Sequence, residues 1–135
     1  MLGEILYEEK GKTTGVRVLS SDGGEVTVEV TLQAQGKIQG MEETSMWTYW
    51  SKTRPDGTIY GEGKGVLVTK EGDVVNLVGS GATRARGSDG SVHYRGAIYF
   101  QTTSQKLSKL NGATGIHEYD VDAAGNTVAK IWEWK

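Results

Sequence analysis

The chain has 135 residues and a formal net charge of -2 at pH 7, with 15 Lys and Arg against 17 Asp and Glu. This balance gives no overall electrostatic signature of nucleic-acid binding, although charges of one sign can still gather locally in the fold, and the absence of cysteine excludes disulfides and thiolate metal sites. No apolar run approaches the roughly 20 residues of a membrane helix, and the first residues lack a signal-peptide pattern. We therefore expect one cytoplasmic domain over residues 1–135, with neither nucleic acid nor membrane as partner.

Five short segments that end in glycine predict tight hairpins along the chain. In a three-residue hairpin loop the first two residues form a type I turn, and the third needs a positive φ that glycine adopts without steric cost. Twenty glycines and one proline agree with an all-β chain. The five segments are Ser21–Gly23, Pro55–Gly57, Lys70–Gly72, Ser88–Gly90 and Ala123–Gly125.

The first predicted hairpin contains the clearest strand. Residues 25–35 alternate apolar and polar side chains, which is typical of a sheet with one wet face. A three-residue loop at Ser21–Gly23 pairs Val18 with Val26 and Val16 with Val28, so that the four valines share a face. A two-residue loop would place Arg17 opposite Val28, and the hydrophobic pattern therefore favours the three-residue form.

The same loop rule predicts the registers of the middle strands. It pairs Trp50 with Glu62, Thr48 with Lys64, Glu62 with Ser80, Lys64 with Val78, Ser80 with Ile98, and Arg84 with Tyr94. One face then combines Glu62 and Lys64 with Val66, Val68, Ile98 and Phe100, and we expect this face to line the interior.

The opposite face of the same strands is rich in glycine and aromatic residues. Aromatic side chains that lie over cross-strand glycines stabilise a weak sheet, and glycines allow a sheet to bend into a barrel. The reverse assignment would place this face inside. Its members are Gly61, Gly63, Gly65, Gly79, Gly81, Trp47, Tyr49 and Tyr99.

Three further segments complete the predicted chain order. Residues 35–40 contain two glycines and indicate a bulge or corner, while residues 104–112 predict one or two helical turns, with Ser104 as the cap and Asn111-Gly112 as the stop. The last strand, 128–134, pairs with 114–121 so that Glu118 faces Lys130, and it closes against an early strand. The predicted fold is an all-β, closed, antiparallel up-and-down barrel of about eight strands.

The long meandering strands, Thr102-Thr103-Ser104 before Lys106-Leu107, the segment Leu110-Asn111-Gly112 and the closing residues 131–135 resemble an uncharacterised family of small bacterial proteins with the allene-oxide-cyclase-like barrel. The resemblance covers most of the chain. It implies an eight-stranded barrel with a central cavity, related in fold to plant oxide cyclases, dirigent proteins and bacterial spirocyclases. No catalytic motif of those enzymes matches here, so the resemblance implies the fold alone.

The candidate ligand-binding residues are those that the predicted registers direct into the interior. Glu62 and Lys64 point into the same space, where they either orient a ligand and exchange a proton or form a structural ion pair. Arg84 and Tyr94 either hold an anionic group or stack without a ligand. The full set is Trp50, Tyr60, Glu62, Lys64, Asn76, Arg84 and Tyr94.

The two histidines, His93 and His117, are expected at the surface or in packing, and no spacing of histidine and carboxylate residues indicates a metal site. We expect no cofactor. The main hypothesis is a barrel that binds a small amphipathic or apolar ligand. The alternatives are a cofactor-independent isomerase or cyclase, and a homo-oligomeric structural protein that associates through Gly61, Gly63, Tyr49 and Tyr99.

Overall fold

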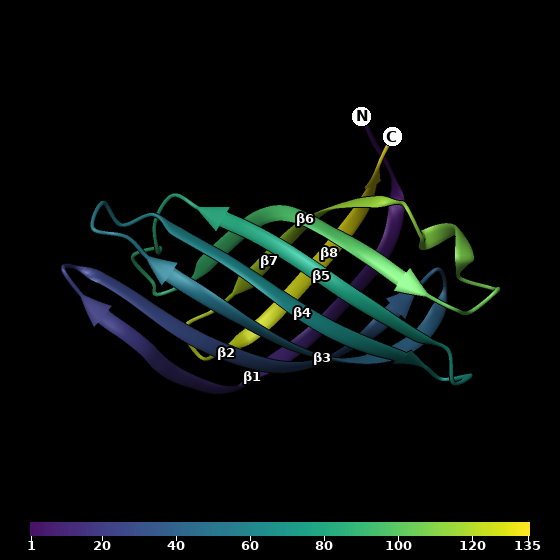
Figure 1. Ribbon diagram of the computed structural model, residues 1–135, viewed down its shortest axis with the longest axis horizontal. Coiled ribbons are helices and arrows are strands. Elements are labelled where there is room, and N and C mark those ends of the chain that lie inside the picture. The colour runs from purple at the N-terminus through teal and green to yellow at the C-terminus, as the bar shows by residue number, and fades with distance from the viewer.

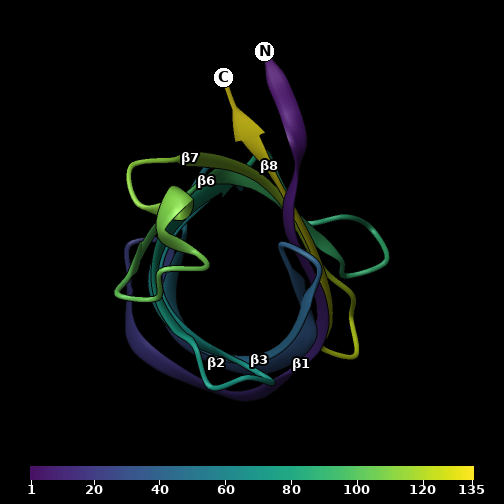
Figure 2. The ribbon, with the colours of Figure 1, turned by 90° about the vertical axis from the view of Figure 1, so that its right-hand side faces the viewer.

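The computed structural model describes residues 1–135 and forms one closed barrel of eight antiparallel strands (Figures 1 and 2). Each strand pairs with the next along the chain, and the last pairs with the first, as the sequence predicts. The elements are β1 (Leu2–Asp22), β2 (Glu25–Ile38), β3 (Met41–Thr53), β4 (Ile59–Thr69), β5 (Val74–Thr83), β6 (Val92–Thr102), the 3-10 turn η1 (Ser108–Leu110), β7 (Thr114–Val121) and β8 (Asn126–Trp134).

Four of the five predicted three-residue loops are confirmed. Each has a main-chain hydrogen bond between its flanking residues, such as Thr69 N to Asp73 O at 2.8 Å, and a glycine of positive φ at its third position. The registers that depend on them follow: Trp50 pairs with Glu62, Lys64 with Val78, and Glu118 with Lys130.

The first loop is the exception, because β1 and β2 are joined by two glycines of positive φ, Gly23 and Gly24. Two consecutive residues of positive φ make the hairpin turn that best matches strand twist. The predicted register is wrong: Val18 pairs with Val28 and Val16 with Val30. The valines still share a face because Leu19 forms a bulge, and a bulge adds one residue to a strand.

The predicted pairing of β5 with β6 is also wrong, by one residue. Ser80 lies opposite Ala97 rather than Ile98, and the paired ladder ends at Ala82 and Arg95. The Ser88–Gly90 loop has the expected form, but residues 84–86 contain an irregular step. One slip turns a whole strand over, so Ile98 and Phe100 belong to the same face as Gly63 and Gly65.

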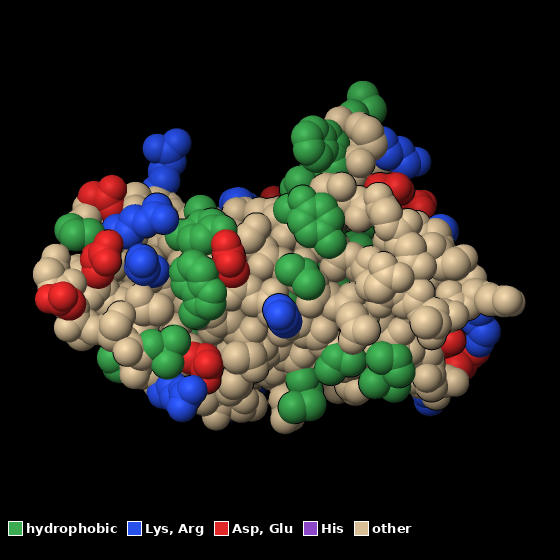
Figure 3. Space-filling view, in the orientation of Figure 1, with side chains coloured by type: hydrophobic (Ala, Val, Ile, Leu, Met, Phe, Trp, Pro, Cys, Tyr) green, Lys and Arg blue, Asp and Glu red, His purple; other side chains and the backbone are tan.

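The glycine-rich face therefore lines the interior, and the expected inner face is wrong. Val66 and Val68 are 36% and 41% exposed, whereas Ile98 and Phe100 are buried. The outer face of β3 to β6 also carries exposed Met46, and Figure 3 shows hydrophobic side chains in separate groups between charged ones.

The barrel interior contains two groups of packed apolar side chains. The larger, of 12 buried residues, includes Leu107 and Leu110 of the η1 segment, which are fully buried and close one end. The smaller consists of Ile59, Val92 and Tyr94 near the other end. The chain termini lie side by side at the η1 end, where the Met1 amino group donates to Lys135 O at 3.0 Å (Figure 1).

The η1 turn confirms the expected short helical element within residues 104–112, but its cap differs. The Ser104 hydroxyl donates to Asp73 at 2.8 Å instead of capping the helix. Asn111 exchanges two side-chain hydrogen bonds with the main chain of Thr102, which fastens the turn to β6. The predicted corner at residues 35–40 is a two-residue turn at Gln39 and Gly40. No helix in the chain is both long and apolar enough to cross a membrane.

Candidate functional site

A cavity lies inside the barrel between the two packed groups. It offers about 80 Å³ to the centres of water molecules, against the roughly 10–15 Å³ that one water requires. Its walls are mostly apolar and aromatic. The lining residues are Tyr7, Glu9, Leu32, Trp47, Tyr49, Gly61, Glu62, Gly63, Gly79, Ser80, Gly81, Tyr94, Ile98, His117, Tyr119, Ala129 and Ile131.

The glycines of β4 make room for the aromatic side chains of β3. A Cβ atom on Gly65 would lie 2.4 Å from the Trp47 ring, and one on Gly63 would lie 2.4 Å from Tyr49 Cβ. Both distances are below any real contact, so a side chain at either position would displace the ring. The alternation of glycine on β4 with Trp47 and Tyr49 on β3 therefore builds the aromatic wall of the cavity.

Three tyrosines form a cluster at this wall. The Tyr94 and Tyr119 rings stack with centroids 5.8 Å apart, and Tyr49 meets both edge to face. Tyr94 shares a 2.6 Å hydrogen bond with Ser51, while the Tyr49 and Tyr119 hydroxyls are 3.4 Å apart. Burial raises the pKa of Tyr49 to about 12 and that of Tyr119 still further, so both hydroxyls remain neutral donors at ordinary pH.

His117 supplies a polar atom without a partner. Its Nε2 lies 2.8 Å from the main-chain oxygen of Ser80, which can only accept, so Nε2 carries a proton and Nδ1 is left as the acceptor of the neutral ring. Nδ1 is buried and has no hydrogen-bond partner. Burial lowers the pKa of His117, which favours this neutral form.

Two acids lie on the same inner surface. Strand pairing places Glu9 of β1 and Glu43 of β3 on either side of Gly36 in β2. A Cβ on Gly36 would lie 2.8 Å from Glu9 Cβ, so the glycine leaves the space that Glu9 occupies. Glu9 and Glu43 are 7% and 4% exposed, and Ser45 Oγ donates to Glu9 Oε2 at 2.7 Å.

Glu43 keeps its proton near neutral pH. Burial, followed by the neighbouring Glu9, raises the pKa of Glu43 from 4.5 to about 9. No hydrogen-bond partner reaches either oxygen of Glu43, so an ionised Glu43 would be an unsatisfied buried charge. Glu43 is therefore a neutral carboxylic acid beside Glu9.

The acids and the tyrosines belong to one cross-strand row. Tyr94 pairs with Tyr119, Tyr119 with Ala129, and Ala129 with Glu9. The next row contains His117, Ile131 and Tyr7. Ala129 is the only residue between Tyr119 and Glu9 in this row, and its small side chain leaves space between them on the inner surface.

Only Tyr94 among the predicted site residues has its side chain inside. Glu62 borders the cavity, but its carboxylate is outside and accepts a hydrogen bond from Tyr60. The Trp50 and Tyr60 rings meet on the outer surface with centroids 5.6 Å apart. Lys64, Asn76 and Arg84 point away from the cavity. These positions follow from the slipped β5–β6 register, which exchanges the two faces.

Sequence reasoning missed Glu9, Glu43 and the inward position of His117. The sequence did contain one signal for the inner face. Trp47 and Tyr49 lie opposite glycines of β4, and glycine at these positions indicates that the aromatic rings pack closely over that face. No comparable signal marks Glu9, since β1 contains Glu4, Glu8 and Glu9 and its bulges hide which of them point inward.

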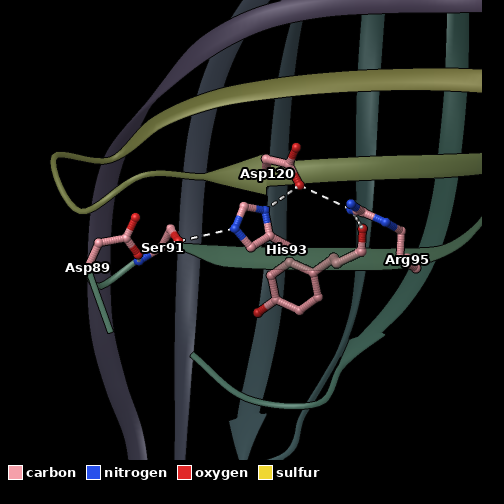
Figure 4. A network of polar contacts seen from close by, with 6 residues as sticks. Asp89, Ser91, His93, Arg95 and Asp120 are labelled. Carbon is pink, nitrogen blue, oxygen red and sulfur yellow. Dashed lines mark hydrogen bonds and ion pairs between the residues drawn. The ribbon is translucent and has the colours of Figure 1, made fainter. Parts of the chain in front are cut away.

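His93 lies on the outer surface, as expected, in the polar network of Figure 4. Its Nε2 is 3.1 Å from Ser91 Oγ and its Nδ1 is 2.8 Å from Asp120, an order of groups found in serine hydrolases. However, the Ser91 hydroxyl donates to Asp89 at 2.6 Å, so its single proton is not available to His93. Arg95 also binds Asp120, and the network ties β6 to β7.

Comparisons with known proteins identify the fold. No family model and no curated protein matches the chain. Among solved structures, a conserved protein of unknown function from Rhodopseudomonas palustris aligns with a TM-score of 0.80 at 14% identity, covering 98% of this chain and 97% of its own. A protein of unknown function from Clostridium acetobutylicum gives 0.78 at 11%, covering 98% and 97%. An enzyme from Penicillium herquei gives 0.69 at 17%, covering 96% and 92%. At these identities the likeness shows a common barrel fold.

Proposed function

We propose that this protein binds a small, largely apolar molecule with a ring or conjugated system in its central cavity. The observation that carries the proposal is a cavity with aromatic walls, lined in part by His117, whose buried Nδ1 is an acceptor with no partner in the protein. Unsatisfied buried polar atoms are rare, and each costs about 1–3 kcal/mol. A ligand with one hydrogen-bond donor would satisfy this atom.

The shape and polarity of the cavity support the same ligand class. Tyr49, Tyr94 and Trp47 offer ring faces and edges, which favour planar apolar groups. The neutral tyrosine hydroxyls also provide donors for a ligand oxygen. We further propose, from the sequence resemblance, that the chain is a bacterial, cytoplasmic protein of the allene-oxide-cyclase-like barrels.

Binding of naphthol, a fluorescent ring with one hydroxyl donor, tests the proposal. We expect one molecule per chain by calorimetry and by the change in naphthol fluorescence. His117→Phe should weaken binding by about 2- to 10-fold, the worth of one neutral hydrogen bond. His93→Phe, a change on the outer surface, should leave the affinity unchanged.

Filling the cavity provides the second arm of this test. Ala129→Leu places a larger side chain between Tyr119 and Glu9 and should abolish naphthol binding, while circular dichroism shows that the barrel is intact. Unchanged affinity in Ala129→Leu, or no saturable binding by the wild-type protein, would exclude the central cavity as the site.

A further inference from the structure

We propose that Glu9 and Glu43 form a proton-transfer centre that acts on the molecule bound in the cavity, with Glu9 as the general base. The inference rests on the proposed binding function and adds a reaction class to it. The substrate class is a conjugated carbonyl compound, or another molecule whose C–H bond is acidified by a neighbouring electron-withdrawing group.

The position of Glu9 is the first argument. It lines the cavity, it is 7% exposed, and the tyrosine row reaches it through Ala129. Its Oε2 is held by Ser45 at 2.7 Å, and Gly36 leaves the space for its side chain. A carboxylate fixed at the wall of an apolar cavity is placed to meet a molecule bound there.

The lack of compensation is the second argument. Neither Glu9 nor Glu43 has a salt bridge. Tyr7 of β1, which also lines the interior, is 1% exposed, and its hydroxyl has no hydrogen-bond partner. Lys10 of β1 and Lys37 of β2, the lysines next to Glu9 and Gly36, are exposed on the outer face. Two buried acids and a buried phenol without a cation reduce stability, and such groups occur mainly where function requires them.

The charge state suits reversible proton transfer. Burial and the neighbouring Glu9 keep the proton on Glu43, so a neutral carboxylic acid lies beside Glu9 in a site of low polarity. Burial, with a smaller contribution from the charge of Glu9, raises the pKa of Tyr119, so its phenol stays neutral. Tyr119 and Tyr49 share one hydrogen bond at 3.4 Å, so one of the two hydroxyls keeps a proton to donate to a negative oxygen that develops in the cavity.

The reaction balances without a co-reactant. The Glu9 carboxylate forms an O–H bond as a substrate C–H bond breaks, and the electron pair moves onto the carbonyl oxygen, where a tyrosine hydroxyl donates to it. The same proton then returns from Glu9 to a different carbon of the conjugated system, the electron pair moves back, and the product is an isomer of the substrate.

The reagent 5-nitrobenzisoxazole tests the base directly. A base removes its C–H proton, the electron pair forms the nitrile, the N–O bond breaks, and the coloured phenolate is released. We expect a saturable rate that naphthol inhibits competitively. Glu9→Gln should reduce the rate by about 100-fold or more, as loss of a general base does. Glu9→Asp keeps the carboxylate and should retain part of the rate.

Matched controls separate a positioned base from a structural acid. Glu8→Gln changes the adjacent outer acid of β1 and should leave the rate unchanged. Glu43→Gln should remove the part of the pH–rate profile that lies near pH 9, where Glu43 loses its proton. Normal naphthol binding with equal rates in Glu9→Gln and wild-type protein would overturn the proton-transfer centre alone. Absence of both binding and rate would overturn the binding function as well.

Discussion

Glu43 has a buried carboxyl group, and its contribution to stability depends on pH. Its pKa is raised to about 9 when the protein is folded, against an ordinary value of 4.5. Between these values the folded chain binds a proton that the unfolded chain releases. The contribution of Glu43 to stability is therefore fully present below about pH 4.5 and is lost as pH rises towards 9.

We predict that Glu43→Gln flattens the dependence of stability on pH between 7 and 9. In the wild-type protein the free energy of unfolding should fall with a slope of up to about 1.4 kcal/mol per pH unit from this group, because one proton is at stake. Burial lowers the pKa of His117 below its ordinary value of 6.5, so its effect on the free energy of unfolding, which has the opposite sign, falls below pH 7. Urea denaturation at several pH values measures the slope.

The control for this titration is Glu42→Gln, which alters the neighbouring outer acid of β3. It should keep the wild-type slope. If the free energy of unfolding depends on pH equally in Glu43→Gln and wild-type protein, Glu43 does not retain a proton in the folded barrel.

The inner glycines make a second prediction at the residue scale. Gly65→Ala should destabilise the barrel by about 1–3 kcal/mol, because its Cβ would lie 2.4 Å from the Trp47 ring. Gly15→Ala is the control, since its Cβ meets only the Thr31 hydroxyl, at 3.0 Å, and alanine suits a strand better than glycine. Thermal unfolding compares the two. An equal effect of both substitutions would show that Trp47 moves aside freely.

At the scale of the elements, strand register decided what the sequence could predict. Eight strands, their order and most hairpin loops follow from alternation and from glycine at positions of positive φ. The inner face does not, because it depends on one irregular step at residues 84–86 that no turn residue marks. The expected position of the candidate site depended on this step: with the faces exchanged, Gly61 and Gly63 of β4 face inward rather than Glu62 and Lys64.

The bulge at Leu19 is a second irregular position that the sequence did not predict. Gly23-Gly24 is the pair that a two-residue hairpin turn prefers, and it is visible in the sequence. A regular ladder from this turn would pair Asp22 with Glu25 and place Arg17 opposite Val30, which conflicts with the hydrophobic pattern. The extra residue of the bulge satisfies both the turn and the pattern. The bulge therefore allows the preferred two-glycine turn and the common face of the valines to occur in the same hairpin, which a regular ladder would not.

A ladder of alternating charge crosses the outer surface of the strands. Arg95 pairs with Glu118, Glu118 with Lys130, Lys130 with Glu8, Glu8 with Lys37, and Lys37 with Glu42. Lys70 extends it, with Nζ 3.4 Å from Glu42. Each opposite-charge neighbour is worth about 0.2–1 kcal/mol, and each residue inside the row serves two neighbours.

We predict that Lys37→Glu destabilises the barrel by about 1–2 kcal/mol, because it replaces two attractive pairs by two repulsive ones. The loss should shrink in 1 M salt, where charges are screened within about 3 Å. Lys52→Glu is the matched control, since Lys52 faces Thr27 and Tyr60 rather than charged residues. Urea denaturation at two salt concentrations compares them. A loss that is independent of salt would assign the effect to packing.

At the scale of the whole molecule, the two ends of the barrel differ. The η1 turn fills one end with fully buried leucines, while the β1–β2 hairpin extends past the other end and past its neighbour β8 (Figure 1). The last β1–β8 pair is Lys12 with Asn126, so residues 14–22 of β1 have no partner on that side. The contact face expected from sequence is divided, because Gly61, Gly63 and Tyr49 line the cavity and Tyr99 is outside.

The unpaired edge of β1 leads to a prediction about association. Val16 and Val18 are 61% and 66% exposed beside free main-chain donors and acceptors, and such edges pair readily with another strand. We predict that two copies pair antiparallel through this edge. Arg17 and Asp22 both point to the outer face, and one register places Arg17 of each copy opposite Asp22 of the other, which gives two ion pairs by symmetry.

Sedimentation over a range of concentrations measures this association, and a charge exchange tests the register. Arg17→Asp and Asp22→Arg should each weaken the dimer, because each places like charges opposite one another. The double variant should restore it. Arg17→Asp also breaks the 3.0 Å ion pair with Glu29 inside the chain, but the double variant carries the same defect. Its recovery relative to Arg17→Asp therefore reports only the contact between copies. A wild-type protein that stays monomeric at all concentrations, or a double variant no tighter than Arg17→Asp, would contradict edge pairing in this register.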